Sequence, residues 1–407
     1  MKEIAVIGFG VVGGGVVSLT DDNAAEIRAA AGEDVHVRYI LDLRDFPDSP
    51  YGDRVVHDMQ TILDDDDVAL VVETMGGVHP ALEYSLAALS RGKHVVTSNK
   101  ELVANHGAEL MRTAAEHGAA YLYEASVGGG IPLIRSMRTS LAGDTIDGVS
   151  GILNGTTNYI LTRMRTGGVS FAEALAEAQQ LGYAERDPSA DIHGKDAQRK
   201  IMILAAVATG YLVREENVLT ESMAGVTVED IEAASRLGGA VRLIGTFTAR
   251  ADGISLSVAP RIVPASNPLA HIDDVYNGVS VRTRRTGDVL YYGRGAGRFP
   301  TAGAVISDVI AALNGSYRTE ARRVWENAPD GYALPAAEER ARMYVRVTGA
   351  PRTEVLDAAG QLFGDITVPG GTPAGKTEFV TPELPFGTVE NMLSALPGGV
   401  ESRLRLL

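Results

Sequence analysis

A glycine-rich turn directly after the first apolar run is the feature that most constrains the fold of this chain. Residues 3–7 read EIAVI, the continuous apolar pattern of a buried parallel strand. Residues 8–13 read GFGVVG and open a segment with helical periodicity that continues to about Ala30. Because it lies between a strand and a helix, this G-x-G-x-x-G pattern is typical of a dinucleotide-binding turn. The sequence therefore predicts a Rossmann-type sheet in its first part.

Each glycine of this turn has a physical role. We expect Gly8 to allow the tight turn, Gly10 to let the backbone approach a pyrophosphate, and Gly13 to allow close packing of helix on strand. The N-terminus of the helix supplies unpaired N–H groups for the phosphates. After the second predicted strand, Asp42 would bind a ribose 2′-hydroxyl and favour NAD, whereas Arg44 would bind a 2′-phosphate and favour NADP. This pattern leaves the choice between the two cofactors open.

Further strands and helices alternate after this turn, with predicted strands at 35–41, 69–72, 94–96 and 121–124 and predicted helices at 80–90 and 101–117. Such alternation predicts a doubly wound parallel sheet, which binds ligands at the carboxyl ends of its strands. Lys100 lies at such an end, where a solvated lysine would oppose the dipole of the following helix. We therefore predict that Lys100 belongs to a ligand site.

Two more glycine-rich stretches follow. Residues 124–132 read EASVGGGIP, and three consecutive glycines indicate either backbone that comes close to another group or a flexible hinge. Residues 291–301 read YYGRGAGRFPT and open an apolar helix through about Leu313. This second loop either returns to the cofactor or completes the sheet domain.

From Gly148 the pattern changes to that of an α+β substrate domain. It contains a predicted strand at 149–153, a polar turn at 154–158, predicted helices from Tyr159 and over 171–180 and 200–210, and antiparallel strands at 241–248, 254–260 and 279–286. Residues 181–204 read LGYAERDPSADIHGKDAQRKIMIL and concentrate acids and lysines in a loop that leads into an apolar helix.

Asp196 and Lys200 are four residues apart, so on a helix they share one face. Alone, this pair is typical of a solvated surface ion pair. Beside a dinucleotide fold, Lys100 and Lys200 become candidates for moving the proton of a substrate oxygen, since lysine does so when its surroundings lower its pKa. Glu185 and Asp196 could then bind a substrate ammonium group.

Composition limits the function classes. A chain of 407 residues predicts two or three domains, and a formal charge of −15 argues against non-specific binding of nucleic acid or anionic membranes. The absence of cysteine excludes disulfides, thiolate metal sites and a thiol nucleophile. The first residues have no signal-peptide pattern, and no apolar run approaches the roughly 20 residues of a membrane helix. We expect a soluble cytoplasmic protein.

Several segments together resemble homoserine dehydrogenases. They are, in the order of that family, GFGVVG (8–13), TSNKELVA (97–104), EASVGGGIP (124–132), GILNGTTNYIL (151–161), LGYAERDPSADIHGKDAQRK (181–200) and GAGRFPTA (295–302). The resemblance implies interconversion of L-aspartate 4-semialdehyde and L-homoserine with NAD(P)(H), on the route to threonine, methionine and isoleucine. Another hydroxy-amino acid as substrate, or a non-catalytic nucleotide or amino-acid sensor, stays open as an alternative.

The resemblance also implies roles for individual residues. Lys200 is implied as proton donor or acceptor beside Lys100, and Glu185, Asp196 and Asp191 as substrate-binding residues. Cofactor-binding positions are implied at Gly8, Phe9, Gly10, Val11, Val12, Gly13, Arg44, Thr97, Lys100, Gly182 and Gly297. A sodium ion is implied at Glu124, Val127, Gly129 and Ile131, since oxygen ligands suit a hard cation.

The predicted domains are a Rossmann domain at 1–130 completed by 298–318, a substrate and dimerisation domain at 131–297, a polar linker at 319–340 and a tail at 341–407. The tail has a predicted βαββαβ order, typical of a small ferredoxin-like unit, and resembles an ACT regulatory domain. ACT domains usually have an Asp-x-x-Gly turn where this chain has residues 349–353, GAPRT. The tail would then serve assembly only, and the family implies a homodimer or homotetramer.

Overall fold

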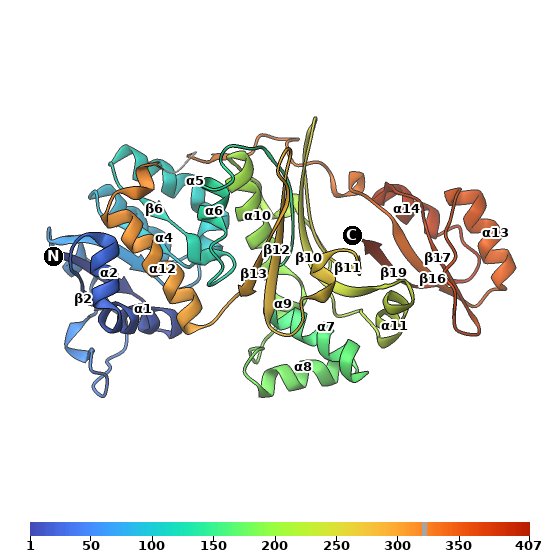
Figure 1. Cartoon of the computed structure of the whole chain (residues 1–407), viewed down its shortest axis with the longest axis horizontal. Coiled ribbons are helices and arrows are strands. Elements are labelled where there is room, and N and C mark those ends of the chain that lie inside the picture. Colours follow the sequence, from blue (N-terminus) through green and yellow to red (C-terminus); the bar gives the residue numbers. More distant parts are fainter. Residues whose placement is uncertain (320–323) are drawn as a thin grey trace. The chain divides into compact units, whose positions relative to one another are not determined.

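The computed structural model describes residues 1–319 and 324–407, and its contacts divide the chain into two compact units (Figure 1). The first unit comprises Met1–Ile146, Met202–Arg214 and Thr283–Ala328. The second comprises Asp147–Ile201, Glu215–Arg282 and Pro329–Leu407. Within the described residues, no helix is both long enough and apolar enough to cross a membrane.

The first unit is built on a six-stranded parallel sheet of order β3-β2-β1-β4-β5-β6. Its strands are β1 Lys2–Ile7, β2 Val35–Leu41, β3 Val55–Val56, β4 Val68–Glu73, β5 His94–Thr97 and β6 Tyr121–Leu122. The order reverses between β1 and β4, and this is the switch point at which doubly wound sheets bind ligands. The predicted Rossmann-type α/β fold is confirmed.

Two groups of helices accompany this sheet. One contains α1 (Val11–Asp22), α2 (Ala24–Ala31) and α12 (Arg298–Leu313), and the other contains α3 (Met59–Leu63), α4 (Ala81–Ser90) and α5 (Lys100–Glu116). Val305 and Val309 of α12 are fully buried in the same core as Ile4 and Val6 of β1. The helix after the second glycine-rich loop therefore completes the core of this unit.

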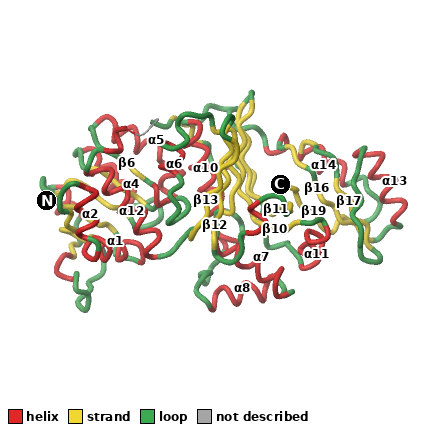
Figure 2. The backbone as a smooth tube through the Cα atoms, in the orientation of Figure 1, coloured by secondary structure: helices red, strands yellow, loops and turns green. Residues whose placement is uncertain are grey.

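The second unit contains a mixed sheet, whose long strands stand out in Figure 2. Its order is β12-β7-β10-β11-β19-β16-β17, with β7 Ile146–Ile152, β10 Gly239–Arg250, β11 Gly253–Pro264 and β12 Tyr276–Thr283. β10 and β11 form an antiparallel hairpin, and β9 (Leu219–Thr220) pairs with β11 in parallel. The helices are α7 Gly155–Gly167, α8 Phe171–Gln180, α9 Ser189–Ile192 and α11 Val228–Arg236, together with α10 (Lys195–Thr209) as far as Ile201.

The C-terminal part of this unit comprises β16 Met343–Thr348, α13 Arg352–Phe363, β17 Lys376–Val380, α14 Phe386–Leu393 and β19 Gly399–Leu406. The predicted strand at 365–368 is wrong, because only Thr367 forms an isolated bridge, to Val380. Pro369, Gly370 and Gly371 directly follow, and these residues do not support a strand ladder. β19 pairs with both β16 and β11, so the tail shares one sheet with the strands before it.

Several other boundaries differ from the predictions. The predicted first long helix is two helices that meet at Asn23, and the predicted strand at 121–124 ends at Leu122. α10 begins at Lys195, so both Asp196 and Lys200 lie on it. The pattern missed α11 and β13 (Gly287–Arg294). Within the predicted linker, β14 (Glu326–Asn327) pairs with β8 (Tyr211–Leu212), and residues 320–323 lie outside the described residues.

Candidate active site

The loop between β1 and α1 has the geometry that its glycines predict. Gly8 has φ +93°, a left-handed conformation that disfavours a side chain, which confirms the tight turn. A Cβ at Gly13 would lie 1.9 Å from the carbonyl oxygen of Gly8, which confirms the close packing of helix on strand. Within the described residues, no heavy atom lies within 4 Å of a Cβ built at Gly10, and no side chain caps α1 there. Space and N–H groups at the start of α1 are thus available to an anion.

A cavity of about 390 Å³ opens beside this loop, at the carboxyl ends of β1, β2 and β4. Its lining residues are Gly8, Gly10, Leu41, Asp42, Leu43, Arg44, His57, Thr74, Met75, Pro80 and Tyr84. This position, at the switch point of the sheet, is where a doubly wound domain holds a dinucleotide. The cavity is also within the size range of ligand pockets.

Asp42 and Arg44, which favour opposite cofactors, bind each other. Arg44 Nε donates to Asp42 Oδ1 at 3.0 Å, and Arg44 Nη2 donates to Asp42 Oδ2 at 3.1 Å. The N–H of Phe9 also donates to Asp42 Oδ2 at 2.9 Å. These bonds, above all those from Arg44, lower the pKa of Asp42 to about 2. A ribose hydroxyl or phosphate at this position therefore competes with an existing ion pair, and the choice between NAD and NADP stays a prediction.

The turn after β5 is built on a buried acid. Glu73, fully buried, accepts a hydrogen bond from Thr97 Oγ1 at 2.5 Å, and burial raises the pKa of Glu73. Asn99 caps α5, because its Oδ1 accepts the N–H of Leu102 at 3.1 Å. Lys100 is the first residue of that helix. The sequence interpretation took Glu73 only as a strand end; an acid closing an apolar strand was the available signal.

The two glycine-rich loops of the first unit lie against each other. A Cβ at Gly129, which has φ +55°, would lie 2.6 Å from the carbonyl carbon of Gly295. The N–H of Gly130 donates to the carbonyl of Arg294 at 3.2 Å. The close-approach interpretation of the three glycines is therefore confirmed. Gly297, with φ +125°, is the N-cap residue of α12.

Glu124, the predicted sodium ligand, is buried, and its carboxylate lies at the start of α6 (Ile134–Arg138). Its carboxylate accepts the N–H groups of Ile134 and Arg135 at 2.9 and 2.6 Å, while its own N–H donates to Asp308 at 2.7 Å. Burial raises the pKa of Glu124 and that of Asp308. The described residues contain no group of three or more His, Cys, Asp or Glu side chains that could hold a metal ion. Any cation here would rely on one carboxylate and the backbone carbonyls of the predicted set.

In the second unit, Lys200 and Asp196 form a buried ion pair. Lys200 Nζ donates to Asp196 Oδ2 at 2.7 Å and to the carbonyl oxygen of Leu153 at 2.8 Å. The side chains of Lys200 and Asp196 are only 10% and 7% exposed. The solvated surface pair is therefore the wrong interpretation. A buried pair must be well satisfied to offset its desolvation cost, and the carbonyl of Leu153 supplies a further bond to Lys200.

Asn154 joins a second carboxylate to this pair. Its Nδ2 donates to Asp196 Oδ2 at 2.8 Å and to Asp191 Oδ1 at 2.7 Å. Its Oδ1 accepts the N–H of Thr157 at 2.9 Å and so caps α7. Burial, followed by the charge of Asp196, raises the pKa of Asp191. The sequence interpretation placed Asn154 only in a polar turn; its position as the cap of a helix directly after a strand could have singled it out.

Glu185 is not brought into this cluster. It lies exposed in the loop between α8 and α9, and within the described part of the chain its carboxylate makes no hydrogen bond or ion pair. Gly182, with φ +75°, begins the same loop, which Thr156 ties to α7 through a 2.6 Å hydrogen bond to the carbonyl of Tyr183. The predicted roles of Glu185 and Gly182 stay predictions.

These features together define a class of protein. A Rossmann unit with an open dinucleotide turn supplies a hydride carrier, and a buried lysine held among carboxylates supplies proton transfer and polar binding. This combination defines an NAD(P)-dependent oxidoreductase.

Comparisons with known proteins agree with this class. The family model described as the NAD binding domain of homoserine dehydrogenase matches residues 8–124, and that described as homoserine dehydrogenase matches residues 132–310. The homoserine dehydrogenase of Synechocystis sp. is 43% identical over 76% of this chain and 72% of its own length. That of Corynebacterium glutamicum is 37% identical over 89% of this chain and 83% of its own length.

Solved structures show the same likeness. The homoserine dehydrogenase of Thiobacillus denitrificans has a TM-score of 0.91 and 32% identity, covering 100% of this chain and 98% of its own. A hyperthermophilic archaeal homoserine dehydrogenase in complex with NADPH has a TM-score of 0.66 and 29% identity, covering 77% of this chain and 98% of its own.

The chain belongs to the homoserine dehydrogenase family, whose members are NAD(P)-dependent oxidoreductases acting on a CH–OH group. The predicted family, fold class and reaction class are therefore confirmed. The family models match within residues 8–310, so the ACT-like character of the tail stays a prediction.

The ion pair at Asp42 predicts a pH-dependent contribution to stability. An acid whose pKa is lower in the folded chain contributes stability above its unfolded pKa and loses that contribution as the pH falls toward the folded value. For Asp42 this window runs from the ordinary 3.8 down to about 2. The difference in free energy of unfolding between wild type and Asp42→Asn, measured with urea, should be largest at neutral pH and shrink through this window. Arg44→Gln should reduce the difference already at neutral pH. A difference that does not change with pH would contradict the assignment.

Proposed function

We propose that this chain interconverts L-homoserine and L-aspartate 4-semialdehyde by hydride transfer with NAD(P)(H), and that Lys200 moves the proton of the substrate oxygen. The observation that carries the proposal is the buried cluster of Lys200, Asp196, Asn154 and Asp191. Such a cluster supplies both a proton-transfer group and carboxylates within reach of an amino-acid ammonium group.

The bonds of Lys200 support its role. An ammonium group has three N–H donors, and two of them go to Asp196 and to the carbonyl of Leu153. The third is available to a substrate oxygen. In the reducing direction, hydride adds to the aldehyde carbon while this N–H donates its proton to the oxygen. In the oxidising direction, the neutral amine takes the hydroxyl proton as hydride leaves the carbon.

Asp191 and Asp196 are proposed to hold the substrate ammonium group, together with the exposed Glu185 of the adjoining loop. A substrate cation would lower the cost of placing the half-buried Asp191 beside the buried Asp196, since burial and the charge of Asp196 already raise the pKa of Asp191. Lys100 is proposed to lie beside the nicotinamide and the substrate oxygen. The proposed cofactor-binding residues are Gly8, Phe9, Gly10, Val11, Val12, Gly13, Arg44, Thr97, Lys100, Gly182 and Gly297.

The cofactor supplies hydride when it is bound, and the residues of the first unit orient it. The backbone of Phe9, Val11 and Val12 is proposed to hold the phosphates at the start of α1, while Arg44 lies near the ribose. Assembly as a homodimer or homotetramer, the ACT-like character of the tail and a cytoplasmic location stay predictions from the sequence.

Replacement of Lys200 tests the proposal. Lys200→Ala should lower kcat for homoserine oxidation by about 100-fold or more, because the proton-transfer group is lost. Lys195→Ala is the matched control: this lysine is exposed on the same helix and should be replaceable with little effect. Absence of wild-type turnover of homoserine with both NAD and NADP, or full activity of Lys200→Ala, would contradict the proposal. A panel of other hydroxy-amino acids checks the substrate.

A sodium ion is proposed at Glu124 and at the carbonyls of Val127, Gly129 and Ile131. The buried carboxyls of Glu124 and Asp308 support it, because burial raises the pKa of each and a cation would favour their charged forms.

Replacing NaCl with choline chloride at equal ionic strength should lower the melting temperature of the wild type. Glu124→Gln should melt at the same temperature in both salts. Equal wild-type melting temperatures would contradict the cation site.

A further inference from the structure

One segment of the second unit contacts both the helix end that carries Asp191 and the C-terminal strands. This bridging segment, residues 219–236, comprises β9, the turn 221–223 and α11. It makes hydrogen bonds to the end of α9 and ion pairs to the strands of the tail.

On the side of the acidic cluster, the turn holds the end of α9. The N–H of Met223 and the hydroxyl of Ser222 both donate to the carbonyl oxygen of Ile192, at 3.0 and 3.2 Å. Ile192 is the residue directly after Asp191. A Cβ built at Gly194 would lie 3.0 Å from the side chain of Thr220, so the α9–α10 turn packs closely on β9. The backbone that presents Asp191 is thus fixed by the bridging segment.

On the side of the tail, Arg405 of β19 holds the first residue of the same turn. Its side chain is 1% exposed and donates to Glu221 through Nη1. The Nε atom of Arg405 lies 3.2 Å from Glu339, and its guanidinium carbon lies 4.1 Å from the ring centre of Phe386. The N–H of Glu221 also donates to the carbonyl of Val258 at 2.8 Å. The guanidinium is held from several directions and fixes the Glu221 carboxylate in turn.

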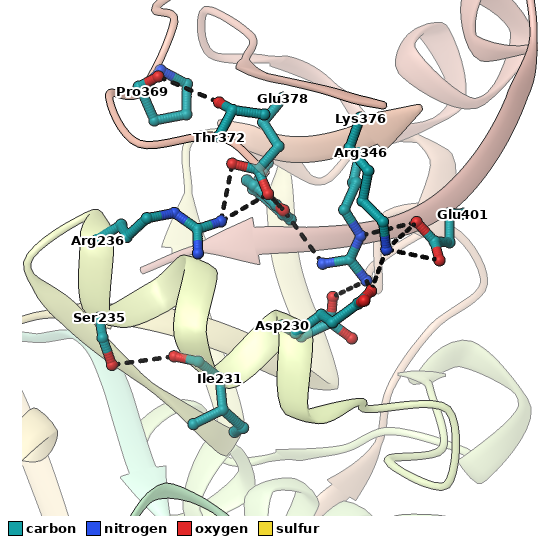
Figure 3. Close-up of polar contacts among 12 residues, drawn as sticks. Asp230, Ile231, Ser235, Arg236, Arg346, Pro369, Thr372, Lys376, Glu378 and Glu401 are labelled. Carbon is teal, nitrogen blue, oxygen red and sulfur yellow. Dashed lines mark hydrogen bonds and ion pairs between the residues drawn. The ribbon is translucent and has the colours of Figure 1, made fainter. Parts of the chain in front are cut away.

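A second set of ion pairs holds α11, as Figure 3 shows. Arg346 of β16 lies 2.9 Å from Asp230, and Arg236 donates both to Glu378 Oε1 at 2.7 Å and to Glu378 Oε2 at 2.9 Å. Lys376 of β17 pairs with Glu229. The helix that follows the turn is therefore also fixed to the C-terminal strands.

We propose that Glu221 and Arg405 are positioning residues for the substrate-binding carboxylate Asp191. The ion pair fixes the turn, and the turn fixes the carbonyl of Ile192. The preceding residue is Asp191, whose carboxylate accepts a hydrogen bond from Asn154. Lys200 itself bonds to Asp196 and to the carbonyl of Leu153, and its only link to Asp191 within the described hydrogen bonds runs through Asp196 and Asn154. Loss of the ion pair should therefore weaken binding of the amino-acid substrate and leave proton transfer intact. The inference rests on the proposed function, because it assumes that Asp191 binds substrate.

Steady-state kinetics of the full-length enzyme test the inference. Glu221→Gln and Arg405→Leu should each raise KM for homoserine about five-fold or more, with kcat and KM for the cofactor within about two-fold of wild type. The double variant should be no worse than the worse single variant, because both remove one interaction. Arg403→Leu is the matched control: it lies on the same strand and pairs instead with Glu390 of α14. Its KM should stay at the wild-type value.

Asp191→Asn separates the two claims. If it leaves KM for homoserine unchanged, the proposed substrate-binding role of Asp191 and the inference that rests on it are both overturned, while turnover of homoserine still supports the proposed reaction. If it raises KM while Glu221→Gln and Arg405→Leu do not, the inference alone is overturned. A fall in kcat and in cofactor affinity in both ion-pair variants would indicate a merely structural role and would also overturn it. If Arg405→Leu does not fold, Glu221→Gln alone tests the inference. Glu221 is 30% exposed, and the glutamine side chain that replaces it needs no counter-charge.

Discussion

The amide of Asn154 binds two carboxylates at once, and the arrangement of Lys200, Asp196 and Asp191 around it depends on these bonds. Asp191 and Asp196 would repel each other in a buried place, and burial together with the charge of Asp196 already raises the pKa of Asp191. The two N–H groups of the Asn154 amide and the ammonium group of Lys200 offset this cost. Asn154 also caps α7, so the same side chain bonds to the start of that helix and to both acids. A substrate ammonium group would find its carboxylates already in place.

An asparagine cap near a buried acid also occurs in the first unit. Asn99 caps α5 directly after β5, and the neighbouring Thr97 hydrogen-bonds the buried Glu73. In both units an asparagine cap lies near a lysine of interest: Lys100 follows Asn99, and Lys200 bonds to the carbonyl of Leu153, the residue before Asn154. Capping fixes where α5 begins and so fixes the position of Lys100. Lys200 lies on α10, and Asn154 is linked to it through the carboxylate of Asp196.

The sequence predicted those features that depend on local geometry. The turn at Gly8 and the close packing at Gly13 follow from what a glycine permits, and the contact of Asp196 with Lys200 follows from helical spacing. The burial of that pair and its bond to Asn154 could not be predicted, because Asp196 and Asn154 are 42 residues apart and only the tertiary fold brings them together. Arg405 reaches Glu221 across 184 residues for the same reason. The expected strand at 365–368 is wrong because Pro369, Gly370 and Gly371 directly follow it and leave only an isolated bridge from Thr367 to Val380.

The substitution Asn154→Asp tests whether the amide of Asn154 holds Asp191 and Asp196 in the arrangement that catalysis needs. Aspartate can still cap α7, but it replaces the shared amide donor with a third carboxylate. Single-turnover formation of NAD(P)H from homoserine should slow by about 100-fold, while the dissociation constant of NADPH stays at the wild-type value. A wild-type rate of hydride transfer in this variant would contradict the account.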